Sequence, residues 1–199
     1  MATQNALFPG LGSESQRLAP RGFRYEEDIV SEAEEAALVA SLALLDLKPF
    51  EFHGHLGNRR VASFGLRYDF ARRSVQTADQ FPSFLADLRK KVAKFAGRLV
   101  DEFRQIGVNQ YPPGAGIGWH KDKSQFGVIV GVSLLAPATM RFRRKEGNRW
   151  LRVSQGLLPR SIYILEGEAR TMWEHSIPPM DALRYSLTFR TLAEDFKPR

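Results

Sequence analysis

Residues 184–190 read RYSLTFR, and the alternation in this run decides the fold. As a β-strand, whose side chains alternate between two faces, the run has one apolar face and one polar face. The apolar face consists of Tyr185, Leu187 and Phe189, and the polar face of Arg184, Ser186, Thr188 and Arg190. The apolar face can pack in a core. The polar face is either a solvent-facing edge or a pocket wall for a small dianion, because guanidinium groups bind carboxylates through paired hydrogen bonds.

Further β-type runs precede this one, separated by Pro and Gly: IGVNQY at 106–111, FGVIVGVSLL at 126–135, TMRFRR at 139–144 and RSIYILEG at 160–167. Two helical patterns come earlier. Residues 31–47 begin with a capping box of Ser31 and Glu34, and residues 82–103 carry an apolar stripe that ends at Phe103. Residues 50–70 resemble short strands and turns, and residues 1–22 an irregular arm. This order predicts an α+β fold, a sandwich or barrel with helices packed on one side.

Composition limits the classes of function. The chain has 199 residues, which favours one domain, and it contains no cysteine, which excludes disulfides and thiolate chemistry. No signal peptide or membrane span is evident, so we expect a cytoplasmic protein without a membrane partner. The net charge of +7 favours a polyanionic partner, although many basic proteins bind no nucleic acid.

A candidate metal site lies in IGWHKDKS, residues 117–124. In an extended strand, His120 and Asp122 would point to the same side. His175 is available as a third ligand, just past RSIYILEG. Two histidines and one carboxylate on one side of a metal form the arrangement of non-haem Fe(II) oxygenases, which leaves positions open for a co-substrate and O₂. An H-x-D step is common by chance, so the spacing alone indicates a metal site only weakly.

Asn109 and Tyr111 also lie two apart and could face the same dianion. With them, the order N-x-Y, H-x-D, a distant His and R-Y-x-L-T-F-R resembles the AlkB family of Fe(II)- and 2-oxoglutarate-dependent dioxygenases. The resemblance covers about residues 104–192. It implies a double-stranded β-helix, or jelly roll, and one dioxygenase domain over residues 23–199, with a catalytic core at 104–192 and helices and a substrate-recognition segment at 23–103.

The resemblance also implies residue roles. His120, Asp122 and His175 would hold Fe(II), Tyr111 and Arg184 would bind the distal carboxylate of 2-oxoglutarate, and Asn109 and Arg190 would lie by its chelating carboxylate. Repair members often have Asn where this chain has Ser186, and we expect 2-oxoglutarate binding to be retained, with a water filling the gap that the shorter serine leaves. The implied reaction, with O₂ as co-substrate, removes N-methyl groups from bases such as 1-methyladenine and 3-methylcytosine in DNA alkylation repair. Its products are formaldehyde, succinate and CO₂.

The substrate base would have to be single-stranded or flipped out of a duplex. Candidate nucleic-acid contacts are Arg59, Arg60, Phe64, Arg67, Tyr68, Lys121 and Lys123, where each of the first five could equally be surface or core. Lys121 and Lys123 should point away from the metal. His53 and His55 form an H-x-H step without a third ligand, and a basic cluster at 141–149 is either a solubilising turn or a nucleic-acid rim.

Several alternatives remain open. The oxygenase could act on tRNA or other RNA, on a protein side chain or on a lipid. The chain could bind nucleic acid without catalysis, or be a zinc hydrolase. No protein partner is evident, and we expect a monomer.

Overall fold

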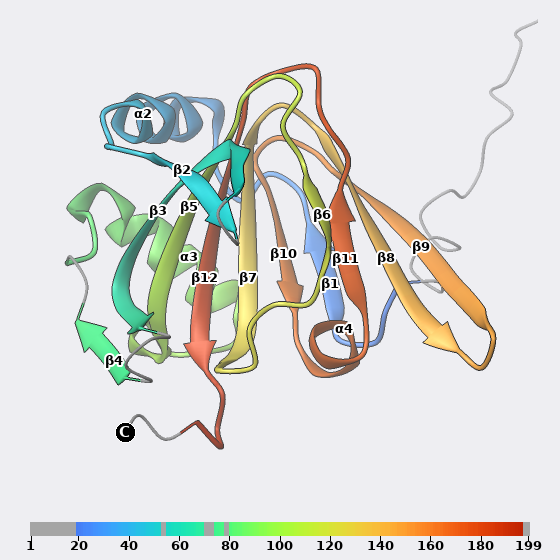
Figure 1. Ribbon diagram of the computed structural model, residues 1–199. Helices are drawn as coiled ribbons and strands as arrows, with labels where there is room; N and C mark the ends of the chain where they lie inside the picture. The colour runs from blue at the N-terminus through green and yellow to red at the C-terminus, as the bar shows by residue number, and fades with distance from the viewer. Residues whose placement is uncertain (1–18, 53–54, 70–73, 78–79, 197–199) are drawn as a thin grey trace, which may run out of the picture.

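The computed structural model describes residues 19–52, 55–69, 74–77 and 80–196, with only the backbone for residues 52, 55–56, 67–69 and 74–77. Its larger sheet has eight strands in the order β1-β10-β7-β12-β5-β3-β2, with β4 paired to β3 (Figure 1). These strands are β1 (Phe23–Glu26), β2 (Lys48–Phe52), β3 (His55–Asp69), β4 (Ser74–Thr77), β5 (Phe103–Tyr111), β7 (Phe126–Leu135), β10 (Ser161–Leu165) and β12 (Arg184–Leu192).

A second sheet of four strands faces the first. Its order is β6-β11-β8-β9, and the strands are β6 (Ile117–His120), β8 (Ala138–Glu146), β9 (Arg149–Leu157) and β11 (Glu174–Ile177). Apolar side chains from both sheets, among them Ile129, Tyr163, Met140 and Phe142, form one buried cluster. All strand pairs are antiparallel. The predicted jelly roll is confirmed.

Helices cover the outer face of the larger sheet, as predicted. Helix α2 (Glu32–Ala43) and helix α3 (Ala86–Ala96) place their buried side chains against that face, in a cluster that includes Tyr185, Leu187 and Phe189 of β12. The apolar face predicted for RYSLTFR is therefore core. Its polar face points into the space between the two sheets, where the site lies. In the described ranges, no helix is long and apolar enough to cross a membrane.

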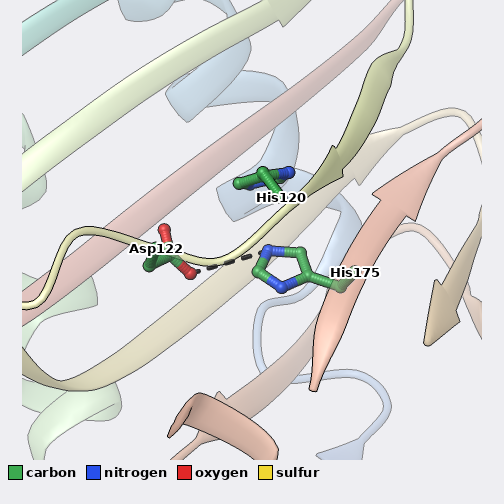
Figure 2. A group of neighbouring side chains, drawn as sticks. All are labelled: His120, Asp122 and His175. Carbon is green, nitrogen blue, oxygen red and sulfur yellow. Dashed lines mark ion pairs between the residues drawn. The ribbon is translucent and has the colours of Figure 1, made fainter. Parts of the chain in front are cut away.

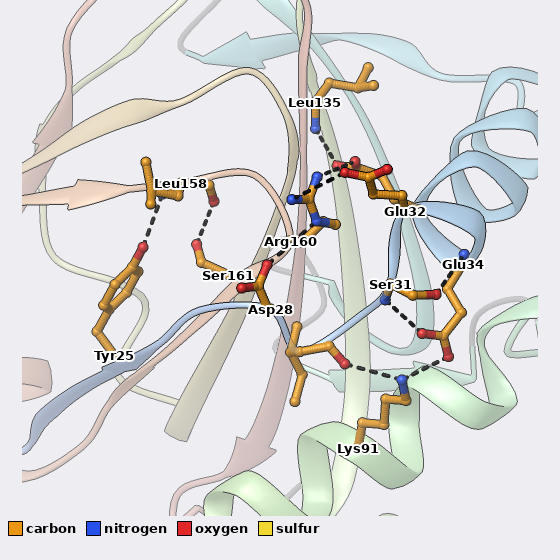
Figure 3. Close-up of polar contacts among 12 residues, drawn as sticks. Tyr25, Asp28, Ser31, Glu32, Glu34, Lys91, Leu135, Leu158, Arg160 and Ser161 are labelled. Atoms are coloured by element: carbon orange, nitrogen blue, oxygen red, sulfur yellow. Dashed lines mark hydrogen bonds and ion pairs between the residues drawn. The ribbon is translucent and has the colours of Figure 1, made fainter.

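The start of α2 confirms the predicted capping box (Figure 3). The Ser31 hydroxyl accepts from the Glu34 backbone N–H at 3.2 Å, and the Glu34 carboxylate accepts from the Ser31 N–H at 2.8 Å. Lys91 of α3 pairs with Glu34 at 2.7 Å and so links the two helices. Arg160, in the β9–β10 turn, pairs with Asp28 at 3.6 Å and with Glu32 at 3.9 Å, which ties α2 to the sheet.

The second predicted helix is shorter than expected. A 3₁₀ turn at Ser83–Leu85 leads into α3, which ends at Ala96 because Gly97 adopts a left-handed conformation with φ of 65°. Such a glycine is a common helix stop. The prediction was wrong from residue 97 onward: Leu99 is 74% exposed, and Phe103 begins β5. A 3₁₀ turn at Val100–Glu102 connects the residues after the helix to β5.

The short strands predicted for residues 50–70 are β2 and one long strand, β3. Residues 1–18 of the predicted arm, and His53 of the H-x-H step, lie outside the described residues, as does the side chain of His55. The division of the chain into a recognition segment and a catalytic core stays a prediction.

Candidate active site

Two neighbouring strands bring His120 and His175 together. Strands β6 and β11 pair antiparallel with His120 directly opposite His175, and the ring centroids are 4.3 Å apart (Figure 2). Asp122 follows, with its Oδ2 3.5 Å from His175 Nε2. One potential ligand atom from each of the three residues lies within 4.8 Å of the others. Strand β6 ends at His120, so Asp122 stands in the loop after it rather than in the strand, yet both side chains converge as predicted.

Hydrogen bonding, burial and neighbouring charges act on these three side chains in different ways. His120 Nδ1 lies 2.9 Å from the Gly118 carbonyl oxygen, which can only accept, so this contact uses Nδ1 as a donor and leaves Nε2 as the ring nitrogen turned to other partners. Burial lowers the pKa of His175 to about 4, despite the opposing charge of Asp122, so this ring is neutral at pH 7. Burial raises the pKa of Asp122, but neighbouring His175, Arg190, His120 and Arg170 together lower it below its ordinary value.

Arg170 positions the loop that carries Asp122. It lies on α4 (Gly167–Thr171), a single turn between β10 and β11, and is 7% exposed. Its Nη2 donates to the carbonyls of Lys123 and Phe126, the latter at 2.8 Å, and so joins both ends of the loop after Asp122. Sequence reasoning missed Arg170. Its position five residues before His175 was the one available signal, and no motif marks a buried arginine on so short a helix.

The polar face of β12 forms one wall of the cavity beside these ligands. In register, Ser186 lies between Asn109 of β5 and Ser133 of β7, and Arg184 lies next to Tyr111. The cavity is lined by Asn109, Tyr111, Ser186, Thr188 and Arg190, together with His120, Asp122 and His175. The structure thus brings the predicted metal ligands and the predicted dianion-binding residues to one place, although Arg184 itself is set behind the lining.

Arg184 is a fully buried cation with unused donors. Its Nε donates to the Ser133 hydroxyl at 2.9 Å, and its guanidinium carbon lies 5.3 Å from the Tyr111 ring centroid. Neither Nη atom has a hydrogen-bond partner, and none of the described carboxylates pairs with this arginine. Burial lowers its pKa, although the guanidinium stays charged. Buried charges are normally paired, so a carboxylate ligand fits this position.

Arg190 is a partly buried cation that lines the cavity. Its Nη1 donates to Gln105 Oε1 at 2.8 Å, while Nε has no partner. Gly107 leaves room for it, because a Cβ there would lie 2.8 Å from Arg190 Nη1 and from Thr188 Oγ1. Glycine within a strand is unusual and often marks a place where another group packs closely against the backbone. The glycine in IGVNQY was therefore a sequence signal for this contact.

Tyr163 is a further cavity residue that sequence reasoning missed. It lies opposite Gly131 across β10 and β7, and a Cβ at Gly131 would overlap its ring. Burial raises the pKa of the Tyr163 hydroxyl to about 12, so the group stays protonated and can donate a hydrogen bond. Gly131, the second glycine inside FGVIVGVSLL, was the signal for a large side chain packed over this position.

The predicted nucleic-acid contacts separate into several groups. Arg59 lines the cavity, with its guanidinium 3.8 Å from the Phe50 ring centroid. Arg60 alternates to the other face of β3 and is exposed, and Phe64 on that same face packs against the core below the helices. The role of Phe64 as a base-stacking residue stays a prediction, which this packing does not favour. Lys121 and Lys123 are exposed and do not line the cavity, and the side chains of Arg67 and Tyr68 lie outside the described residues.

Comparisons with known proteins agree with this geometry. The family model "2OG-Fe(II) oxygenase superfamily" matches residues 24–190. An Arabidopsis thaliana protein named "Alkylated DNA repair protein ALKBH8 homolog" is 31% identical over 76% of this chain and 49% of its own length. The Mus musculus "tRNA (carboxymethyluridine(34)-5-O)-methyltransferase ALKBH8" is 30% identical over 94% of this chain and 28% of its own length. The chain thus spans half or less of these two relatives.

Two further similarities concern the family and the fold. The "Alpha-ketoglutarate-dependent dioxygenase AlkB" of Salmonella typhimurium (strain LT2) is 31% identical over 64% of both chains. The solved structure of OsALKBH1 superposes with a TM-score of 0.59 at 16% identity, covering 87% of this chain and 98% of that one, which supports the fold. The chain belongs to the 2OG-Fe(II) oxygenase superfamily and, within it, to the AlkB family of Fe(II)- and 2-oxoglutarate-dependent dioxygenases.

Proposed function

We propose that this dioxygenase removes N-methyl groups from bases such as 1-methyladenine and 3-methylcytosine in nucleic acid, releasing formaldehyde, succinate and CO₂. The observation that supports it best is the His120, Asp122 and His175 cluster next to a cavity backed by the uncompensated Arg184. The net charge of +7 and the position of Arg59 on the cavity favour an anionic macromolecular substrate. DNA alkylation repair is the setting that we propose first.

In this proposal each of the predicted metal-binding and co-substrate-binding residues has a role. His120, Asp122 and His175 would hold Fe(II) through two imidazoles and one carboxylate, the donor set suited to this metal. The iron, when bound with 2-oxoglutarate and O₂, would supply the oxidising power for hydroxylation of the N-methyl carbon. Tyr111 and Arg184 bind the distal carboxylate of 2-oxoglutarate, because the two Nη atoms of Arg184 are unpaired behind the Tyr111 ring. Asn109, Ser186 and Arg190 contact the remainder of the co-substrate from the same wall.

The remaining cavity residues control water and access. Ile117, Ile129, Leu165 and Ile177 line the cavity with apolar surface, which keeps water away from the reacting groups. The cavity lies between two sheets, so a base reaches it only from a single strand or after flipping out of a duplex. Arg59 lines the cavity and, in this proposal, contacts a phosphate next to that base. We propose that the protein acts as a monomer.

The test is a panel of single- and double-stranded DNA and RNA oligonucleotides that carry 1-methyladenine or 3-methylcytosine. Each is incubated with Fe(II), ascorbate and 2-oxoglutarate and analysed by mass. We expect loss of one methyl group, with succinate formed in equal amount. Asp122→Ala should lose this turnover and bind iron at least about a hundredfold more weakly, because a ligand is missing. Absence of demethylation on every oligonucleotide, with an iron-loaded protein that still converts 2-oxoglutarate, would reject the proposed substrate.

A second candidate substrate is a modified uridine in tRNA. It is favoured by the name of the mouse relative, which refers to carboxymethyluridine at position 34 of tRNA. The same assay with bulk tRNA, digested to nucleosides after the reaction, separates the two candidates. A gain of one oxygen atom on a tRNA uridine, without demethylation of the oligonucleotides, would favour the second. A protein substrate would leave both sets unchanged.

A further inference from the structure

The four-stranded sheet has a polar outer face. Its inner face carries His175, Phe142 and Val153 in one row across β11, β8 and β9. Neighbouring residues along a strand point to opposite faces of the sheet. The rows on either side of this inner row therefore belong to the outer face. These rows are Ser176–Arg141–Ser154 and Glu174–Arg143–Arg152, followed toward the hairpin by Lys145 and Trp150.

Cations dominate this face. These rows contain one carboxylate, Glu174, and four cations: Arg141, Arg143, Lys145 and Arg152. Lys145 and Arg152 are exposed. Arg143 Nε donates to Glu174 at 2.5 Å, and Arg141 Nε donates to the Ser176 hydroxyl at 3.1 Å. Glu174 neutralises only part of this positive charge, so the face as a whole is positively charged.

Two tryptophans lie among these cations. The guanidinium carbon of Arg143 lies 4.5 Å from the ring centroid of Trp119 and 4.5 Å from that of Trp150. Arg141 also lies 5.2 Å from the Trp119 ring centroid. These cation–π contacts hold both indoles in place across three strands. Trp150 nevertheless remains 39% exposed, so part of its ring is available for another contact.

An ordered, partly exposed indole among cations matches the chemistry of single-stranded nucleic acid. Such strands are bound by aromatic side chains on which bases stack and by Lys and Arg near the phosphates. We propose that this outer face, defined by Trp119, Arg141, Arg143, Lys145, Trp150 and Arg152, binds the single-stranded nucleic acid next to the base that enters the active site. This inference rests on the proposed function for its biological meaning, although the binding can be measured separately.

The position of the face suits that role. Strand β6 is the edge of the four-stranded sheet and carries Trp119 next to His120. His120 lines the cavity between the sheets, whereas Trp119 contacts Arg143 on the outer face. A strand bound along the outer face would therefore pass the same edge that presents the metal ligands, and one flanking nucleotide could turn inward around β6.

The test uses unmodified, fluorescein-labelled oligouridylate and oligothymidylate of about 12 nucleotides, a length within known single-strand sites. Binding to the full chain is followed by anisotropy over a range of salt. Trp150→Leu should weaken binding about tenfold, because one stacking contact is lost. The double variant Lys145→Gln, Arg152→Gln should lower the slope of log affinity against log salt by about 1.4. The matched control Lys90→Gln, Lys94→Gln removes two charges from α3 and should leave affinity and slope unchanged.

The outcomes separate this inference from the proposed function. Affinities of both outer-face variants equal to that of the parent, or an equal loss in the α3 control, would overturn the inference. Turnover of methylated oligonucleotides is a different readout. If demethylation fails while Trp150→Leu still weakens oligonucleotide binding, the substrate is wrong and the binding face stands. If demethylation succeeds, the outer-face variants should raise the oligonucleotide KM and leave kcat unchanged.

Discussion

Both faces of β12 carry completely buried side chains, but the two faces have opposite chemistry. Under the helices, Leu187 and Phe189 of β12 are 0% exposed and touch other apolar side chains. On the other face, Arg184 is also 0% exposed, yet both its Nη atoms lack partners. A buried donor without a partner costs free energy, whereas buried apolar area stabilises the fold. The difference indicates that one face maintains the fold and the other gives up stability for binding.

Leu187→Ala should have the largest effect on stability. The side chain is completely buried between the sheet and the helices, so its truncation leaves a cavity, and we expect a loss of about 2–5 kcal/mol in the free energy of unfolding. Urea denaturation measures this loss. The KM for 2-oxoglutarate should stay near that of the parent, because residue 187 points away from the cavity.

Ser186→Ala is the matched control on the adjacent residue. It removes one hydroxyl from the opposite face, so we expect a much smaller loss of stability and a rise in the KM for 2-oxoglutarate. If Leu187→Ala changed the KM more than Ser186→Ala does, the assignment of the two faces to folding and to binding would be wrong.

Arg184→Met tests the stability cost of the binding face. The substitution keeps apolar volume but removes a buried charge whose donors are unpaired, so stability should be unchanged or higher. The Kd for 2-oxoglutarate should rise about 10- to 100-fold, the effect of losing a hydrogen bond to a charged group. Isothermal titration with 2-oxoglutarate and thermal melting measure the two quantities. A clear loss of stability together with unchanged co-substrate affinity would contradict a carboxylate-binding role.

The sequence predicted most of the difference between the two faces, because the alternation of side chains along β12 can be read from a short stretch of residues. Alternation alone separated Leu187 from Ser186, and the spacing of Asn109, His120, Asp122 and Arg190 within the family's order placed them at one site. What remained hidden depends on contacts between distant residues. Tyr163 needs Gly131 below it, and Arg170 acts through the carbonyls of residues 123 and 126.

Local signals also failed where two patterns competed. The apolar stripe of residues 82–103 continued beyond Gly97, but the left-handed glycine ended the helix, and Leu99 became exposed. Phe64 was grouped with Arg59 by composition, whereas the register of β3 against β5 sets the face of each side chain: Arg59 lines the cavity, and Phe64 packs against the core on the opposite face. Composition could not supply that register. The choice between a catalytic and a non-catalytic protein, left open by H-x-D alone, required the complete set of motifs and the family match.

Arg170→Leu should weaken the metal site without removing a ligand. Its Nη2 joins two carbonyls of the loop after Asp122, so its loss should let the carboxylate move and reduce iron affinity about tenfold. Iron titration measures this change, and affinity for 2-oxoglutarate should change less. Thr171→Ala, at the exposed neighbouring position, is the control and should behave as the parent. Partial recovery of iron affinity in Arg170→Lys would separate positioning from simple loss of packing.

The smallest effect is expected at Glu34, which belongs to the helix-covered face alone. The ion pair with Lys91 and the hydrogen bonds with Ser31 lower the pKa of Glu34 from 4.5 to about 2. The folded state therefore favours the ionised form. The contribution of ionised Glu34 to the stability of the folded state is complete above pH 4.5 and is lost as the pH falls toward 2.

Glu34→Gln should accordingly melt slightly below the parent at pH 7, and the difference should shrink between pH 4.5 and 2. The contacts of Glu34 are exposed, so added salt should reduce the difference as well. Thermal melting across this pH range measures the effect. Since the described polar contacts of Glu34 are with Ser31 and Lys91, on the helix-covered side of the sheet, iron and 2-oxoglutarate affinities at pH 7 should not change. A change in either would mean that the two faces of the sheet are coupled through α2.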